Sequence, residues 1–172
     1  MNKSVHIHGK TNIDKINHKL PQDRLITNKW VNKNLLSNKD KHIHYLYNIK
    51  HNIMFNGFND IIYEIKNKRN SYANQDVKMA RYDPNLLISN DQIVNMLYKN
   101  KLKCYYCKDK CLLMYTKVRD NKQWTLDRIN NDIGHYNDNV VIACLSCNLK
   151  RRLLDDEKFK FTKQLSITKL NT

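Results

Sequence analysis

The pattern of hydrophobic and polar positions divides the chain into three parts. Residues 1–55 are rich in Asn, Lys, His and Ile and show little periodicity, which predicts a basic region that is loosely structured or partly disordered. Residues 56–101 carry helical periodicity and predict a mainly helical region. Residues 102–172 alternate short apolar runs with polar turns, and they contain most of the residues that can carry chemistry.

Two helices are predicted in the middle part. Residues 58–80 place large apolar side chains near helical spacing among charged ones, and the Tyr-Asp-Pro run at 82–84 ends this pattern. A second helix is expected to start at Ser89, which forms a capping box with Gln92, and to end near Asn100. Its apolar face consists of Ile93, Met96 and Leu97.

The last part predicts a small mixed unit. Residues 111–118, 123–129 and 139–143 are apolar enough, or alternate well enough, for short strands. A polar loop around Gly134 separates the last two strands, and residues 146–156 predict a helix after them. The order of strand, loop, strand and helix predicts an α+β fold for this part of the chain.

Charge and targeting signals narrow the class of protein. With 31 Lys and Arg against 16 Asp and Glu, the 172-residue chain has a formal net charge of +15. This charge favours a polyanionic partner, although a merely soluble basic protein is the plainer alternative. The start, MNKSVHIHGK, lacks the apolar segment of a signal peptide, and no run approaches the roughly 18 apolar residues of a membrane helix. The sequence therefore predicts an intracellular protein of the cytoplasm or nucleus, neither secreted nor membrane-bound.

Four of the five cysteines form two CxxC pairs. Cys104 and Cys107 make the first pair, and Cys144 and Cys147 make the second. Two such pairs complete a tetrahedral four-sulfur zinc site, which leaves no open position for a substrate and is therefore structural. The alternative is two unrelated cysteine pairs in a core. Cys111 is left over as a free thiol, although an exchange of ligands with Cys107 is conceivable.

The motifs of residues 102–165 resemble the HNH, or ββα-metal, endonuclease family. The resemblance rests on LDRI at 126–129, on the loop from Gly134 to Asn139, on NVVIA at 139–143 and on CLSCNLKR at 144–151. These motifs are most similar to zinc-containing members related to phage junction-resolving and mobile-element endonucleases. The resemblance implies a ββα-metal core with a four-cysteine zinc knuckle, placed after a mainly helical or partly disordered N-terminal region.

The resemblance also assigns roles to individual residues. Asp127 matches the acidic metal ligand on the first strand, and Asn139 matches the residue that holds the loop in shape. Asn148, nine positions after Asn139, matches the second metal ligand on the helix. Hard oxygen ligands of this kind suit Mg²⁺ or Mn²⁺. The plainer alternatives are an exposed strand-end carboxylate for Asp127 and a helix-capping residue for Asn148.

The sequence departs from the family at the general base. Where the family has a histidine after the acidic ligand, this chain has Arg128, which can relieve charge on a phosphate but stays protonated and cannot act as a base. His135 in the polar loop is the first candidate for the missing base, and Tyr136 is the second. A phosphate or loop contact, or a plain surface histidine, remains the alternative for His135.

A basic run follows the second metal ligand. Lys150, Arg151 and Arg152 adjoin the expected metal site and are predicted to contact DNA phosphates, whereas the plainer interpretation is a solvated helix face.

The sequence as a whole predicts a metal-dependent endonuclease that hydrolyses phosphodiester bonds in DNA, with structural Zn²⁺ and catalytic Mg²⁺ or Mn²⁺. The first alternative is a zinc-dependent nucleic-acid-binding protein with weakened catalysis, and the second is a zinc-stabilised interaction module. The DNA target and the oligomeric state are left open.

Overall fold

The computed structural model describes residues 5–17, 23–26, 30, 36 and 39–166. In chain order its elements are α1 (Lys10–Ile16), η1 (Lys39–Lys41), α3 (His42–Lys50), α4 (Phe58–Lys78), α5 (Asn90–Lys99), β1 (Trp124–Arg128), β2 (Val140–Cys144), α6 (Leu145–Arg151) and α7 (Asp156–Gln164). This mixture of helices with a two-stranded sheet is compatible with the predicted α+β class. No helix in these residues is long and apolar enough to cross a membrane.

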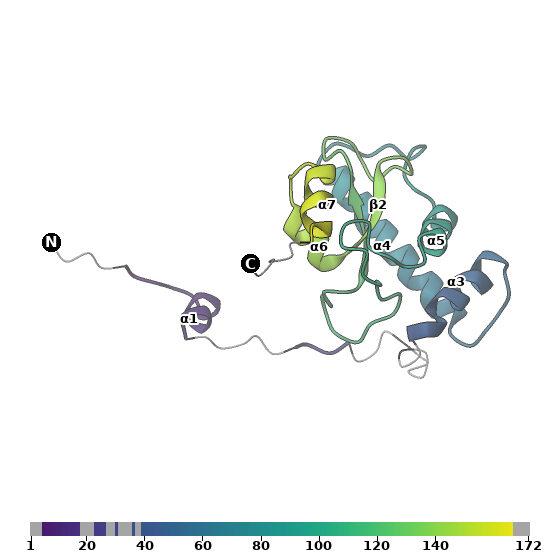
Figure 1. Ribbon diagram of the computed structural model, residues 1–172, viewed down its shortest axis with the longest axis horizontal. Helices are drawn as coiled ribbons and strands as arrows, with labels where there is room; N and C mark the ends of the chain where they lie inside the picture. Colours follow the sequence, from purple (N-terminus) through teal and green to yellow (C-terminus); the bar gives the residue numbers. More distant parts are fainter. Residues whose placement is uncertain (1–4, 18–22, 27–29, 31–35, 37–38, 167–172) are drawn as a thin grey trace, which may run out of the picture.

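The long helix α4 runs through the compact part of the molecule, with α3 and α5 near one of its ends and α6 and α7 near the other (Figure 1). Its buried residues include Ile61 and Ile65, which confirms the predicted apolar face. Helix α5 begins with the predicted capping box. The hydroxyl of Ser89 accepts a hydrogen bond from the Gln92 backbone at 3.1 Å, and the Gln92 side chain accepts one from the Ser89 backbone at 2.8 Å.

Strands β1 and β2 form an antiparallel pair, and α6 follows β2 directly. Trp124 pairs with Cys144 at one end of the register, and Arg128 pairs with Val140 at the other end. Helix α6 contacts both strands. The loop between the strands therefore emerges beside Arg128, while the start of α6 lies beside the opposite end of β1.

Two expected elements differ in the structure. Residues 111–118 form no strand and make only isolated bridges. Leu113, Met114 and Tyr115 are all buried, so this apolar run is covered from both sides and does not alternate between two faces as a strand does. The helix expected over 146–156 is interrupted.

The interruption occurs at Arg152, where the backbone has a φ of 53° and ends α6. Asp155 then caps a new helix, because its side chain accepts a hydrogen bond from the Lys158 backbone at 2.9 Å. One predicted helix is therefore two helices, α6 and α7.

The expected loose structure of residues 1–55 is wrong for residues 42–50. Helix α3 occupies these positions, and Leu46 and Ile49 are buried in it. One buried cluster contains residues from α3, α4, α5, both strands and α7. The predicted helical region and the cysteine-containing region therefore share a hydrophobic core.

Candidate functional site

The four paired cysteines meet in one cluster. The sulfur atoms of Cys104, Cys107, Cys144 and Cys147 all lie within 4.8 Å of one another, and those of Cys107 and Cys144 are 4.0 Å apart. Tetrahedral Zn–S bonds of about 2.3 Å place sulfur atoms about 3.8 Å apart. The cluster could therefore hold a metal ion such as zinc.

Local backbone structure brings the two pairs together. The first pair lies in a turn in which the Lys108 backbone donates to the carbonyl of Cys104 at 3.0 Å. The second pair spans the junction of β2 and α6, where the sulfur of Cys144 caps the helix by accepting from the Cys147 backbone at 3.4 Å. A hydrogen bond of 2.8 Å from the Tyr105 backbone to the carbonyl of Ile142 ties the turn to β2.

Cys111 is fully buried but does not belong to the four-sulfur cluster. Its backbone donates to the carbonyl of Leu102 at 2.6 Å, and its side chain lies against that of Cys104. The leftover thiol and the exchange of ligands with Cys107 both stay predictions for Cys111.

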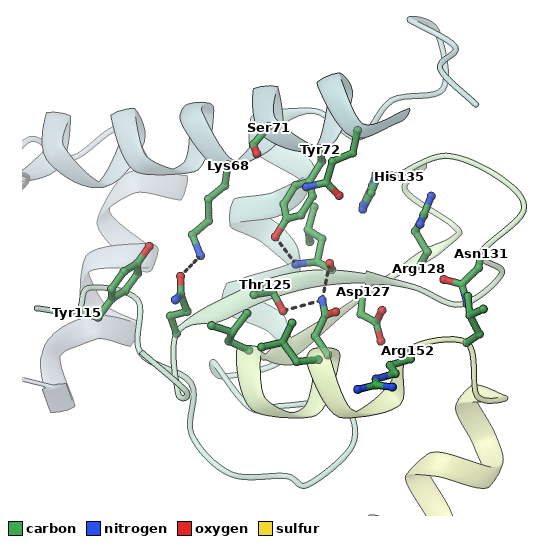
Figure 2. Close-up of a pocket in the computed structure, with 17 residues that line it drawn as sticks. Lys68, Ser71, Tyr72, Tyr115, Thr125, Asp127, Arg128, Asn131, His135 and Arg152 are labelled. Carbon is green, nitrogen blue, oxygen red and sulfur yellow. Dashed lines mark hydrogen bonds between the residues drawn. The ribbon is translucent and has the colours of Figure 1, made fainter. Parts of the chain in front are cut away.

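A cleft of about 620 Å³ lies between α4 on one side and β1 with α6 on the other. Four of the predicted catalytic residues, Asp127, Arg128, His135 and Asn148, line this cleft together with Arg152. Figure 2 shows Lys68 and Tyr72 extending from α4 toward β1. The cleft therefore gathers candidate residues that come from a strand, a loop and a helix.

Asp127 is buried and has two partners inside the protein. The hydroxyl of Tyr106 donates to Oδ2 at 2.6 Å, and the guanidinium of Arg151 donates to Oδ1 at 3.2 Å. Burial raises the pKa of the Asp127 carboxyl above its ordinary value, although both partners favour the anion and act in the opposite direction. The alternative interpretation of Asp127 as an exposed carboxylate at a strand end is therefore wrong, because Asp127 is only 7% exposed.

Asn148 is held against β1 by its amide nitrogen. Nδ2 donates to the hydroxyl of Thr125 and to the carbonyl of Leu126, both at 3.1 Å. With both amide hydrogens used in this way, Oδ1 is the atom that remains to accept a donor or a cation. Asn148 lies in the second turn of α6, whereas the cap of this helix is Cys144.

Asn139 closes the loop between the strands. Its Nδ2 donates to the carbonyls of Asn130 and Gly134 at 2.9 Å, and its Oδ1 accepts from the Asn130 backbone at the same distance. Three hydrogen bonds from one buried side chain fix the shape of the loop that carries His135.

His135 is buried against α4. Its Nδ1 lies 2.8 Å from Oδ1 of Asp76, and its backbone amide donates to Oδ2 of the same carboxylate at 2.7 Å. The ring stacks on Tyr72 with 4.6 Å between centroids. Burial lowers the pKa of His135 below its ordinary value, whereas Asp76 acts in the opposite direction. His135 is therefore not a surface histidine.

The side chain of Arg128 approaches the same carboxylate oxygen of Asp76 that His135 contacts. One guanidinium nitrogen is 3.6 Å from Oδ1 of Asp76 and 3.5 Å from the carbonyl of Ile133. In Figure 2, His135 lies between Tyr72 and Arg128, with Asp127 farther toward α6. Arg128 thus places a fixed positive charge at the edge of the cleft.

The basic run divides into an internal residue and two surface residues. Arg151 is 1% exposed, and its guanidinium donates to the carbonyls of Arg128 and Ile129 at 2.7 and 2.8 Å as well as to Asp127. This burial argues against the predicted phosphate contact of Arg151, whose bonds instead hold the end of β1. Lys150 and Arg152 are exposed, and Arg152 lines the cleft.

Asp76 and Tyr72 were not predicted as site residues. They come from α4, outside the motifs of residues 102–165, and Asp76 has no exposed surface at all. One sequence signal was available, because Asp76 follows Tyr72 by four positions and so lies on the apolar face of its helix. A carboxylate on such a face requires a buried partner.

Comparisons of this chain with protein-family models, with curated proteins and with solved structures give no match.

Proposed function

We propose that this protein is a metal-dependent endonuclease of the HNH type, which hydrolyses phosphodiester bonds in DNA. The observation that carries the proposal is the cleft itself. It gathers Asp127, Asn148, Arg128 and His135, the residues that the motifs single out, although they are distributed over β1, α6 and a loop. The net charge of +15 supports a polyanionic substrate.

In this proposal the four clustered cysteines bind structural Zn²⁺. The donor set fits, because four sulfurs in one cluster satisfy the coordination of zinc without an open position. The ion would connect the turn before β1 to the junction of β2 and α6. It would thereby fix α6, and with it Asn148, against the sheet.

The remaining donor set fits Mg²⁺ or Mn²⁺. Each carboxylate oxygen of Asp127 accepts one hydrogen bond from the protein and retains a further lone pair, and Asn148 has its Oδ1 unused by its own amide contacts. These two side chains would hold the ion, which when bound supplies charge relief to the phosphate and lowers the pKa of bound water.

The chain's own residues have separate tasks in this mechanism. His135 accepts a proton from the attacking water. Arg128 and Arg152 place positive charge beside the phosphate, where charge develops in the transition state. Asn139 keeps the loop of His135 in position through its three hydrogen bonds.

One observation favours the alternative of a zinc-dependent nucleic-acid-binding protein. The Asp127 carboxylate is already paired with Arg151, and a carboxylate neutralised in this way attracts a divalent ion less strongly than a free one. Such a protein would bind DNA with strong salt dependence and would leave it intact.

Incubation of the purified protein with supercoiled plasmid and with branched DNA separates the two functions. The reactions contain Mg²⁺, Mn²⁺ or EDTA, and nicked and linear products are quantified on gels. Cleavage that requires the divalent ion and is lost in His135→Ala supports the proposed endonuclease. Salt-sensitive DNA binding without cleavage under any of these conditions favours the binding protein.

A further inference from the structure

We propose that Asp76 is a positioning residue for His135, which it holds with Nδ1 protonated so that Nε2 is the basic atom in the cleft. The inference rests on the proposed function and extends it to α4, outside the motifs of residues 102–165. The catalytic unit would therefore include the helical region and not the cysteine-containing region alone.

The contact between the two residues is bidentate and buried. One carboxylate oxygen of Asp76 lies 2.8 Å from Nδ1 of His135, and the other accepts the backbone N–H of His135 at 2.7 Å. The Asp76 side chain is fully buried and the His135 side chain is 4% exposed. Two bonds from one carboxylate fix both the backbone and the ring of His135, which leaves the ring little freedom to rotate.

The surrounding backbone reinforces this contact. The loop of His135 is joined to the segment after α4, because the Ile88 backbone donates to the carbonyl of His135 at 3.0 Å and the hydroxyl of Tyr136 donates to the carbonyl of Arg81 at 2.7 Å. Gly134 allows this close approach. A Cβ there would lie 2.6 Å from the carbonyl oxygen of Arg81 and 3.0 Å from Oδ2 of Asp76.

The carboxylate decides which ring nitrogen carries the proton. Asp76 can only accept, so the neutral imidazole next to it keeps its hydrogen on Nδ1 and has its lone pair on Nε2. Nε2 then takes a proton from water while the water oxygen forms the new bond to phosphorus and the bond to the leaving sugar oxygen breaks. The leaving oxygen takes a proton from solvent, and the imidazolium later returns its proton to solvent.

The charged and titratable groups that face His135 are Asp76 and Tyr72 from α4 and Arg128 from β1. Burial and Arg128 favour the neutral ring, which is the form that a base requires at neutral pH, and Asp76 opposes them. Asp76 therefore stabilises the imidazolium that forms when the proton is taken. Its loss is expected to lower the pKa of His135 further.

The test compares wild type with Asp76→Asn, an isosteric change that presents an amide to the ring. The Asn oxygen can keep the bond to the backbone N–H, and the NH₂ group then faces Nδ1 and favours the opposite tautomer. Cleavage of plasmid is expected to fall by about 10²-fold or more. Asp83→Asn is the matched control, since the Asp83 side chain accepts a hydrogen bond from the Asn85 backbone at 2.8 Å, in the turn after α4.

Nitrogen NMR of ¹⁵N-histidine-labelled protein provides a readout that does not depend on activity. The His135 signals are identified by their loss in His135→Ala. In wild type the neutral ring is expected to carry its proton on Nδ1, and in Asp76→Asn the proton is expected to move toward Nε2 with a lower midpoint of titration. Asp83→Asn should match wild type in both respects.

The outcomes distinguish the two proposals. A wild-type ring protonated on Nε2 overturns the inference, even if Asp76→Asn does not fold. Unchanged tautomer, titration and cleavage rate in a folded Asp76→Asn protein overturn it as well. If wild type cleaves no DNA but shows the Nδ1–H ring and its loss in Asp76→Asn, the proposed function fails while the positioning of His135 by Asp76 stands.

Discussion

Asp127 has hydrogen-bond partners in the structure that its sequence motif does not indicate. The motif assigns it to a metal ion, and the structure adds Tyr106 and Arg151 as partners. Replacement by alanine would leave the buried guanidinium of Arg151 without its counterion, so the loss of activity would be mixed with a loss of stability. A fair test of its role keeps the shape of the side chain.

Asp127→Asn is therefore the informative variant. Its amide can still accept one of the two hydrogen bonds, so we expect a modest cost of about 1–3 kcal/mol in the free energy of unfolding. Cleavage in Mg²⁺ should be lost, because a neutral amide binds the ion weakly, while DNA binding should persist. Urea unfolding, gel-shift titration and plasmid nicking measure the three effects. Nicking at close to the wild-type rate would remove Asp127 from the mechanism.

The pH dependence of cleavage tests His135 at the same scale. A base acts when deprotonated, and the pKa of His135 lies below its ordinary value. The wild-type rate should therefore rise with pH, with a midpoint below the ordinary histidine value of about 6.5, and then level off. His135→Ala should lose this pH-dependent step and cleave about 10²-fold more slowly than wild type. Added imidazole should partly restore its cleavage rate.

Arg128→Ala is the control for this step. It should cleave more slowly but keep the step, moved to higher pH, because Arg128 lowers the pKa of His135. A full rate and an unchanged pH profile in His135→Ala would show that His135 is not the base. Tyr136 would then be the next candidate.

The sequence identifies the candidate residues that belong to one contiguous motif, and it does not identify those that lie outside it. Asp127, Asn139 and Asn148 are readable because fixed spacings within 127–148 identify them. Asp76 is separated from His135 by 59 positions along the chain, and only folding brings the two together. The predicted phosphate contact of Arg151 is contradicted by its burial. The sequence of a basic run does not show which of its side chains face solvent and which face the core.

At the scale of elements, periodicity predicted α4, α5 and the two strands, whereas tertiary contacts decided the rest. Residues 111–118 have the composition of a strand, yet their backbone bonds are scattered. The Leu112 carbonyl accepts from Trp124 at 3.2 Å, and the Thr116 carbonyl accepts from Ile26 at 2.7 Å. The break at Arg152 could not be predicted from the sequence either. Arginine usually continues a helix, yet Arg152 has a φ of 53° and ends α6.

Two adjacent residues of helix α6 are expected to affect different properties, one the stability of the protein and the other its DNA binding. Arg151→Ala removes the guanidinium that bonds Asp127 and the end of β1, and it should cost about 3–5 kcal/mol in the free energy of unfolding. Lys150→Ala, on the exposed side, should leave stability within about 0.5 kcal/mol of wild type but weaken DNA binding and its salt dependence. Chemical denaturation and salt-dependent binding titrations check both. Equal stability of the two variants would contradict the internal role of Arg151.

At the scale of the whole molecule, the cysteine cluster lies at one end of the small sheet, and the cleft runs along β1. Cys144 ends β2 beside Trp124, whereas the cleft is lined by residues from Gln123 to Arg128. The pairing of CxxC units made the cluster predictable from the sequence. The shared core was not predictable, because residues 1–55 show too little hydrophobic periodicity to indicate that α3 forms and packs against α5.

The metal content of the protein gives the last prediction. One Zn²⁺ per chain is expected in purified protein, and Cys107→Ser should release it and lower the melting temperature, since structural zinc contributes roughly 10–16 kcal/mol of apparent binding free energy in small domains. Cys111→Ser is the matched control, because Cys111 is buried nearby but outside the four-sulfur cluster, and it should keep the ion. Elemental analysis with thermal unfolding measures both variants. Because α6 carries both Cys147 and Asn148, zinc loss should also reduce cleavage, even with Mg²⁺ in excess. Folded, soluble wild-type protein without zinc would contradict the site.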